Sequence, residues 1–540
     1  MGRSKKKVAI LLVAIAAVGI LAALGDGILS YFGERSLRSA LSGTSESSRI
    51  EFGSFRLALL PGNVVLRDVE VESRDTTLSP APGVLVHFDE IRLTGVRWLW
   101  ALMGGDLQIG SLQLKHPQVS VDLPPKKAKA KRAQKSVPDP GRESADSAAL
   151  TGLLKSLSLS RLQIRDGAVK LRGMGSSLRL ETSNLDFLLR DLNYRLADSA
   201  FTCKQDSYRI SLDSLDFTDE AGLSRVLAER IETVDAGPLE ARGLRLYVPV
   251  PKEKLADRMG KVASMWYDVC LDRVKTNALN LPEMVRSDSI RLDSIRIEGS
   301  KAFICQDDRY PPAVPYPTIQ EGVNAVSRPL HIGCIDLRLK QFTFQWVTEN
   351  IACGELPMKN VRAIVRNVSN APDNTMELFL NLGMGKGSSL ALSLWTRNDK
   401  KEHIRGKVEA ENLDISLLDP FLRPLFGITA ECQVHRIDGS FSGDKRRAGG
   451  ELCMLYDGLS VHAWEDSPYQ VISSTSGLIN FFAPLVLPKS NPAREGAEPR
   501  RAEIRVERDP MVPYPAYLIQ MLVDGMKNTL LPGGRVKKKK

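Results

Sequence analysis

The chain has 540 residues, of which 43% are hydrophobic and 26% are charged, and this composition excludes a chain that is disordered throughout. The formal net charge is +10, but 15 of the 74 Lys and Arg residues lie in three short segments, 3–7, 126–135 and 535–540. The other 59 are fewer than the 64 Asp and Glu residues. The body of the chain therefore has no excess of basic residues for a nucleic-acid-binding face, and we expect no nucleic-acid partner.

The N-terminus has the pattern of a membrane anchor. Basic residues 1–7 precede an uninterrupted apolar run of 17 residues, 8–24, which residues 25–32 extend to the length of a spanning helix. We expect residues 8–32 to form one transmembrane helix, with the N-terminus in the cytoplasm and the bulk of the chain across the membrane. Its apolar residues include Val8, Leu12, Ile15, Ile20 and Leu24. A signal peptide cleaved after Gly25 is the alternative.

Two segments share one apolar spacing. Residues 109–121 (IGSLQLKHPQVSV) and 159–171 (LSRLQIRDGAVKL) carry apolar side chains at relative positions 0, 3, 5, 10 and 12. Apolar and polar residues alternate within each cluster, which is typical of strands with one buried face. Asp166-Gly167 is a two-residue turn signal, so a hairpin that turns there is expected. A single long strand whose face is corrected by a bulge is the alternative.

The same spacing recurs at three further places. In a chain of this composition about 1–2% of windows match by chance, so the spacing suggests repetition without establishing it. The further matches are Phe88, Ile91, Leu93, Trp98 and Trp100; Leu292, Ile295, Ile297, Ala302 and Ile304; and Ile332, Ile335, Leu337, Phe342 and Phe344.

The first half of the chain divides by composition. Residues 33–123 form an N-terminal β region, and residues 124–148 are rich in Pro, Lys and Ser, which predicts a disordered basic linker. Strands resume in residues 149–219. Residues 220–330 form a mixed insert, in which 220–232 and 252–277 have helical composition.

The second half ends in a helix. Residues 331–515 predict a C-terminal β region, and residues 516–531 predict an amphipathic helix before a basic tail, 532–540. One helical face carries Ile519, Leu522, Val523, Met526 and Leu530. The sequence leaves two partners open for this helix, the end of a sheet and a membrane surface.

No residues with a catalytic pattern were found. None of the six histidines belongs to a zinc-hydrolase or deaminase motif, and the seven cysteines are at least 19 residues apart, so no CxxC pair exists. Residues 383–388 (GMGKGS) have Leu380 where a phosphate loop needs its first glycine, and GSFSG at 439–443 has Phe441 where a nucleophile would stand. We expect no enzymatic activity, no metal and no cofactor.

Ordered features of the chain resemble the AsmA-like family of bacterial envelope proteins, which includes TamB- and YhdP-type members. The resemblance begins with the apolar N-terminus, GDLQIGSLQLKHPQVSV at 105–121, the variable linker and LSLSRLQIRDGAVKL at 157–171. It continues near the C-terminus with LDISLLDPF, IDGSFSG, GGELCMLYDGLSV and IRVERDP. Residues 220–330 depart from the family pattern.

The resemblance implies a mainly β fold: an elongated, twisted antiparallel β-sheet groove in the periplasm, with a few helices and one helix in the inner membrane. It also implies binding of phospholipid acyl chains, and a role in lipid transport and outer-membrane biogenesis. The groove candidates are Ile109, Leu112, Leu114, Val119, Val121, Leu162, Ile164, Val169 and Leu171. The alternative is a membrane-anchored scaffold with a sealed core that binds outer-membrane or other envelope proteins. A continuous accessible apolar furrow would distinguish the first hypothesis from the second.

Overall fold

The computed structural model describes residues 48–58, 62–74, 83–97, 107–124, 156–195, 200–202, 208–233, 237–277, 289–348, 351–385, 387–419, 428–463 and 488–530. Of the described residues, 68% lie in strands and 10% in helices, so the fold is mainly β, and its large sheet is mixed. The predicted antiparallel sheet is therefore corrected where β14 pairs with β15 and where β4, β5 and β6 pair with β7, because these pairs are parallel. The predicted membrane anchor, all but the first residue of the linker, and the basic tail lie outside the described residues. Within the described ranges, no helix is long and apolar enough to cross a membrane.

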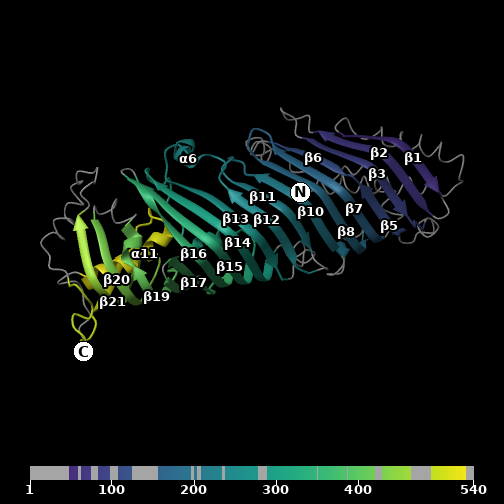
Figure 1. Cartoon of the computed structure of the whole chain (residues 1–540). Helices are drawn as coiled ribbons and strands as arrows, with labels where there is room; N and C mark the ends of the chain where they lie inside the picture. The colour runs from purple at the N-terminus through teal and green to yellow at the C-terminus, as the bar shows by residue number, and fades with distance from the viewer. Residues whose placement is uncertain are drawn as a thin grey trace. The chain divides into compact units, whose positions relative to one another are not determined.

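The chain divides into two compact units, at residues 243 and 244. In unit 1, the strand order is β1, β2, β3, then β5 and β6, then β7, β8, β10 and β11 (Figure 1). Short strands β4 and β9 pair with β7 and β8. The bounds are β1 (Ser48–Ala58), β2 (Asn63–Arg74), β3 (Gly83–Thr94), β4 (Leu107–Ile109), β5 (Ser111–Lys115), β6 (Gln118–Leu123), β7 (Ser156–Gly173), β8 (Arg179–Arg195), β9 (Ala200–Thr202), β10 (Tyr208–Thr218) and β11 (Arg225–Thr233).

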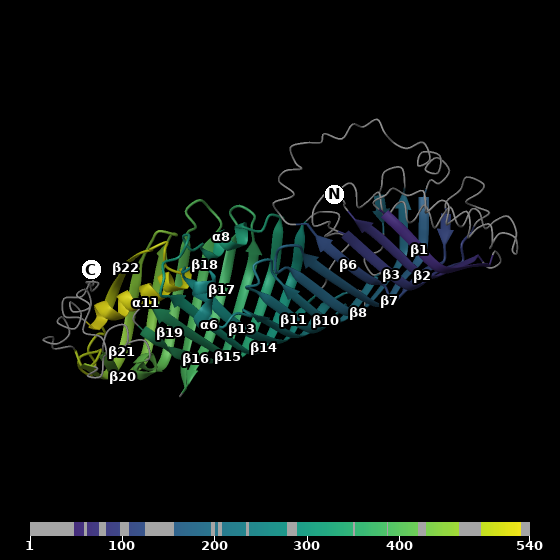
Figure 2. The same cartoon turned by 90° about the horizontal axis from the view of Figure 1, so that it is seen from above.

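The boundary between the units falls within β12 (Leu239–Tyr247). In unit 2, strands β13 to β22 pair in chain order, and helix α11 lies across the last of them (Figure 2). The bounds are α6 (Lys252–Arg258), β13 (Ser264–Thr276), β14 (Ile290–Asp308), α8 (Ile319–Asn324), β15 (Leu330–Thr348), β16 (Ile351–Ser369), β17 (Thr375–Gly385), β18 (Ser388–Arg397), β19 (Ile404–Asp414), the 3-10 turn η2 (Ile415–Leu418), β20 (Ile428–Gly443), β21 (Arg447–Ala463), β22 (Arg501–Glu507) and α11 (Tyr514–Leu530).

Alternation of residue types accounts for these strands. In β19, Ile404, Val408 and Ala410 are buried, whereas the intervening Arg, Lys and Glu side chains are exposed. A period of two places successive side chains on opposite faces of a sheet, so each strand has one apolar and one polar face.

Asp166-Gly167 does not turn a hairpin; it forms a bulge within β7, which runs unbroken from Ser156 to Gly173. Asp166 has a φ of 52°, and the register with β8 shifts between Ile164 and Val169. Gly167 fits there because a Cβ would lie 3.1 Å from Pro117 Cγ and 3.2 Å from the Leu185 carbonyl oxygen. Val169 is five positions after Ile164, an odd interval that would place the two side chains on opposite faces of a regular strand. The bulge places both of them on one face.

The two copies of the apolar spacing lie beside each other. β4, β5 and β6 pair with β7 in parallel, and all five apolar positions match, from Ile109 opposite Leu159 to Val121 opposite Leu171. The copies at 292–304 and 332–344 are also parallel neighbours, with Leu292 opposite Ile332 and Ile304 opposite Phe344. The match that begins at Phe88 has no such partner: β3 pairs antiparallel with β5, and Trp98 and Trp100 lie outside the described residues.

The predicted helices in the insert are corrected at two places. The segment 220–232 lies largely in strand β11, because Val226, Ala228 and Ile231 fit the apolar face opposite β10. In 252–277 only α6 is helical, and the chain turns at Gly260 and Lys261 before β13 begins. Pairing of β13 with β14 overrides the helical composition of residues 264–276.

Candidate functional site

The nine predicted groove residues share one face of unit 1. They occupy neighbouring positions on β4 to β7: Ile109, Leu112, Leu114, Val119 and Val121 on one copy, and Leu162, Ile164, Val169 and Leu171 on the other. Eight of them are half-buried, and Ile109 is buried in the cluster that β1, β2 and β3 form with β4 and β7. The nine residues therefore do form one apolar face, and this face is buried at Ile109.

These residues belong to apolar ladders that cross most of unit 1, perpendicular to the strands. Each ladder is a series of directly paired side chains, one from each strand. The sequence analysis did not predict the members of each ladder on β8 and β10. One ladder consists of Phe55, Leu66, Ile91, Leu114, Ile164, Phe187 and Ile210, and another of Leu57, Val64, Leu93, Leu112, Leu162, Leu189 and Tyr208.

Burial changes along each ladder. Phe55, Leu66 and Ile91 are 7%, 7% and 2% exposed, whereas Leu114, Ile164, Phe187 and Ile210 are half-buried. Side chains under a second layer of protein would be buried throughout, as Phe55, Leu66 and Ile91 are. From β5 to β10 this ladder therefore has only partial cover and offers apolar surface to a ligand, whereas the other ladder ends at Tyr208, which is 5% exposed.

The opposite face of unit 1 is charged and paired. Arg225 donates two hydrogen bonds to Asp216, of 2.8 and 2.6 Å, and these hold the pKa of that carboxyl below its usual value. Arg230 lies 3.0 Å from both Asp213 and Glu232. Such cross-strand ion pairs are typical of a face in contact with water, so the two faces differ strongly in polarity.

Unit 2 repeats the arrangement. Its apolar ladders run from β14 to β22; one of them consists of Ile295, Ile335, Val365, Leu378, Leu394, Gly406, Phe441, Gly450 and Ile504. A second consists of Ile297, Leu337, Ala363, Leu380, Leu392, Val408, Gly439, Leu452 and Ala502. The members on β14 to β17 are half-buried, whereas Leu394, Phe441, Ile504 and Leu452 are 1%, 4%, 1% and 0% exposed.

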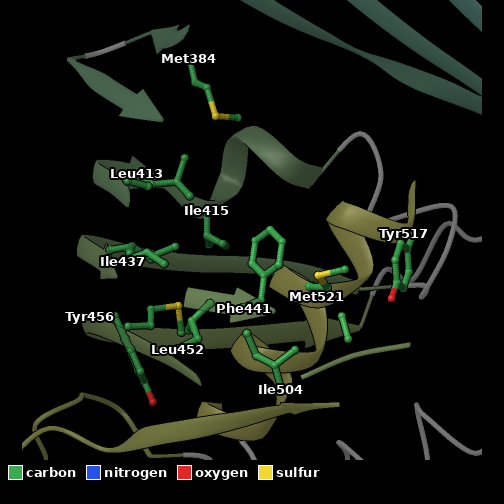
Figure 3. Packing of buried hydrophobic residues seen from close by; sticks show 14 of the residues in the cluster. Met384, Leu413, Ile415, Ile437, Phe441, Leu452, Tyr456, Ile504, Tyr517 and Met521 are labelled. Atoms are coloured by element: carbon green, nitrogen blue, oxygen red, sulfur yellow. The ribbon is translucent and has the colours of Figure 1, made fainter. Parts of the chain in front are cut away.

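Helix α11 explains the buried end of these ladders. Met521 of α11 lies beside Phe441 of β20, above Leu452 and Ile504 (Figure 3). Gly525 permits this approach, because a Cβ there would lie 2.8 Å from Leu452 Cβ and 3.2 Å from Ile504 Cγ1. The apolar face of unit 2 is thus covered at β20 to β22. At β14 to β17 the members of these two ladders are only partly covered, beside a buried cluster of Ala302, Leu339, Met358 and Val361.

The predicted apolar face of this helix packs on the sheet only in part, where Leu522, Met526 and Leu530 contact the buried cluster. The residues buried in α11 are Tyr514, Tyr517, Met521, Gly525, Asn528 and Thr529. Of the five predicted residues, Leu522, Met526 and Leu530 are half-buried, and Ile519 and Val523 are 54% and 49% exposed. Sequence reasoning missed the buried face because Gly525 and Asn528 are not apolar.

The described part of the chain places no three His, Cys, Asp or Glu side chains together in a way that would hold a metal ion. The five cysteines with described side chains are free thiols, and burial raises the pKa of Cys305 and Cys432 to about 11. Thiols of such high pKa are poor nucleophiles near neutral pH.

Neither the comparison with protein-family models nor the comparison with curated proteins gave a match to this sequence.

Proposed function

We propose that this chain binds phospholipid acyl chains along the partly covered apolar faces of its sheets and contributes to lipid transport in the bacterial envelope. The observation that carries the proposal is the ladder of half-buried apolar side chains that continues across successive strands in each unit. Acyl chains form no hydrogen bonds, so a face without polar side chains suits them. Headgroups remain in water at the edge of such a face.

The resemblance to AsmA-like proteins supports the same proposal from sequence. In this account residues 8–32 anchor the chain in the inner membrane, and the β units lie in the periplasm. Transport along such a face requires neither a catalytic residue nor a cofactor, because each step exchanges one apolar contact for another.

Lipid mass spectrometry tests the proposal on the full chain, purified in mild detergent. We expect phospholipid to copurify, and the double variant Ile164→Thr/Val169→Thr to carry several-fold less. Both substitutions keep a β-branched side chain, so the strand is preserved while the face becomes more polar. Lys170→Gln, on the polar face and next to Val169 in β7, is the matched control and should retain its lipid, which corrects for lipid held by the N-terminal apolar segment.

The alternative is a membrane-anchored scaffold without a transport role. The fully buried clusters at β1 to β3, at β14 to β16 and at β19 to β22 are the observation in its favour, because they resemble ordinary sealed cores. If the double variant and the control copurify equal amounts of lipid, the scaffold is the better account.

A further inference from the structure

Strand β1 has a strand neighbour on one side only, within the described part of the chain. It pairs antiparallel with β2 along its whole length, and no other described strand pairs with it (Figure 1). The backbone groups on the second side of such a strand form a template on which a further strand can pair. The edge of β1 is therefore a candidate interaction surface.

Strand β22 of unit 2 also has one strand neighbour, but α11 occupies its second side. The Asp524 carboxylate accepts a hydrogen bond from the Arg505 backbone N–H at 2.8 Å. The Asn528 amide donates one to the Glu503 carbonyl at 3.1 Å. A covered edge of this kind cannot pair with another strand. The described part of unit 1 contains no helix that could cover β1 in the same way.

The apolar side chains of β1 are arranged symmetrically about the point between residues 53 and 54. Phe52 and Phe55 lie on either side of this point, are 6% and 7% exposed, and belong to one buried cluster. Ile50 and Leu57 are the next members on either side, and both are half-buried against that cluster. If a second copy of β1 lies antiparallel beside the first and shares this point, Phe52 faces Phe55 and Ile50 faces Leu57. The apolar face then continues from one copy to the other.

The charged side chains of β1 match in the same register, which places Glu51 of each copy opposite Arg56 of the other. Arg56 is exposed and forms no ion pair with a described residue. Glu51 lies directly opposite Glu70 of β2, and both carboxylates act on Arg49, whose Nε donates a hydrogen bond to Glu51 at 2.8 Å. Like charges directly opposite each other destabilise a strand pair, so a cation on the second side of Glu51 relieves this repulsion.

Neighbouring registers lose this match. Sliding the second copy by two residues in one direction places Arg49 opposite Arg56, and sliding it in the other direction places Glu51 opposite Ala58. Neither register pairs Glu51 with Arg56. Side chains on both faces of the strand therefore specify one register.

From this match we infer that two copies of the chain associate through β1, which pairs antiparallel with β1 of the second copy about a twofold axis. The contact is isologous, so each apolar pair and each ion pair occurs twice. Main-chain hydrogen bonds provide the attraction, and the side chains provide specificity. This contact is separate from the proposed binding of acyl chains, because it uses the edge of the sheet and not its apolar face.

Analytical ultracentrifugation of the full chain in mild detergent, over a range of protein concentrations, tests the inference. We expect the unmodified chain to dimerise reversibly. Glu51→Arg and Arg56→Glu each replace two attractive pairs with two repulsive ones, so each variant should dimerise at least about tenfold more weakly. Both side chains are exposed, and thermal unfolding checks that each variant folds.

An equimolar mixture of the two variants is the matched control. In a mixed dimer one copy has arginine at both positions and the other has glutamate at both, so every facing pair is attractive again. We expect the mixture to dimerise about as strongly as the unmodified chain. A role of either residue within its own chain, or association through the N-terminal apolar segment, predicts no such recovery.

Three results would overturn the inference: an unmodified chain that stays monomeric, single variants that dimerise as well as the unmodified chain, or a mixture without recovery. None of these results bears on the lipid content of the sheet, which the Ile164→Thr/Val169→Thr variant reports independently.

Discussion

At the scale of single residues, the polar face of unit 1 contains one buried carboxylate with several cationic neighbours. Glu90 of β3 is 7% exposed, and its Oε1 lies 2.9 Å from both Arg92 and Lys115, while Oε2 lies 3.4 Å from Arg67. The hydrogen bond from Lys115 is the largest contribution that lowers the pKa of this carboxyl, and burial opposes it. Three strands thus converge on one anion next to the repeated segments.

Glu90→Gln is expected to destabilise the chain by about 1–2 kcal/mol at neutral pH, because a neutral amide loses the ion pairs with Arg67, Arg92 and Lys115. Since folding lowers the pKa of Glu90, its contribution is complete above the unfolded value near 4.5 and disappears as pH falls through the folded value. Thermal unfolding of the two proteins should therefore differ at pH 7 and converge in acid. A difference that is constant across this range would contradict the role of the charge.

At the scale of elements, the apolar spacing predicted more than the positions of strands. The odd interval from 164 to 169 requires a turn or a bulge if the side chains are to stay on one face. The expected hairpin is wrong, and β7 contains the bulge that was the alternative. The nine residues chosen from this spacing do share a face. The sequence could not predict that the copies are parallel neighbours, because periodicity specifies a face and not a neighbouring strand.

Helix α11 shows a further limit of prediction from hydrophobic periodicity. The apolar period predicted that the helix forms, but it did not predict which face of the helix docks on the sheet. The contacts that matter most, at Gly525 and Asn528, come from residues whose types carry no hydrophobic signal. Close approach of a helix to a sheet depends on the absence of a side chain, which a hydrophobicity pattern does not detect.

Gly525→Ala is expected to lower the free energy of unfolding by about 1–3 kcal/mol, because the new methyl group would lie 2.8 Å from Leu452 Cβ and force α11 outward. Gly322→Ala in α8 is the matched control, since a Cβ there meets nothing within 4 Å. Denaturant titration of both variants measures the difference. Equal stability of the two variants would contradict the docking of α11 through Gly525.

At the scale of the whole molecule, the two units share two structural features. Each contains a pair of parallel neighbours with matched apolar positions, β7 beside β4 to β6 in unit 1 and β14 beside β15 in unit 2. Each has apolar ladders that are sealed at one set of strands and half-buried at another. This recurrence argues that partial cover is a property of the architecture rather than a local defect of packing.

Photo-crosslinking in cells tests the central claim, that lipid occupies the half-buried ladders, most directly. A benzophenone amino acid is placed at Phe187 or Phe344, which lie on the apolar faces of units 1 and 2, and at the adjacent Leu188 or Thr343, which lie on the opposite faces. Mass spectrometry of the irradiated protein then detects covalent adducts. Phospholipid adducts are expected at Phe187 and Phe344, with few at Leu188 and Thr343. Equal labelling of both faces, or protein adducts without lipid at Phe187 and Phe344, would contradict the central claim.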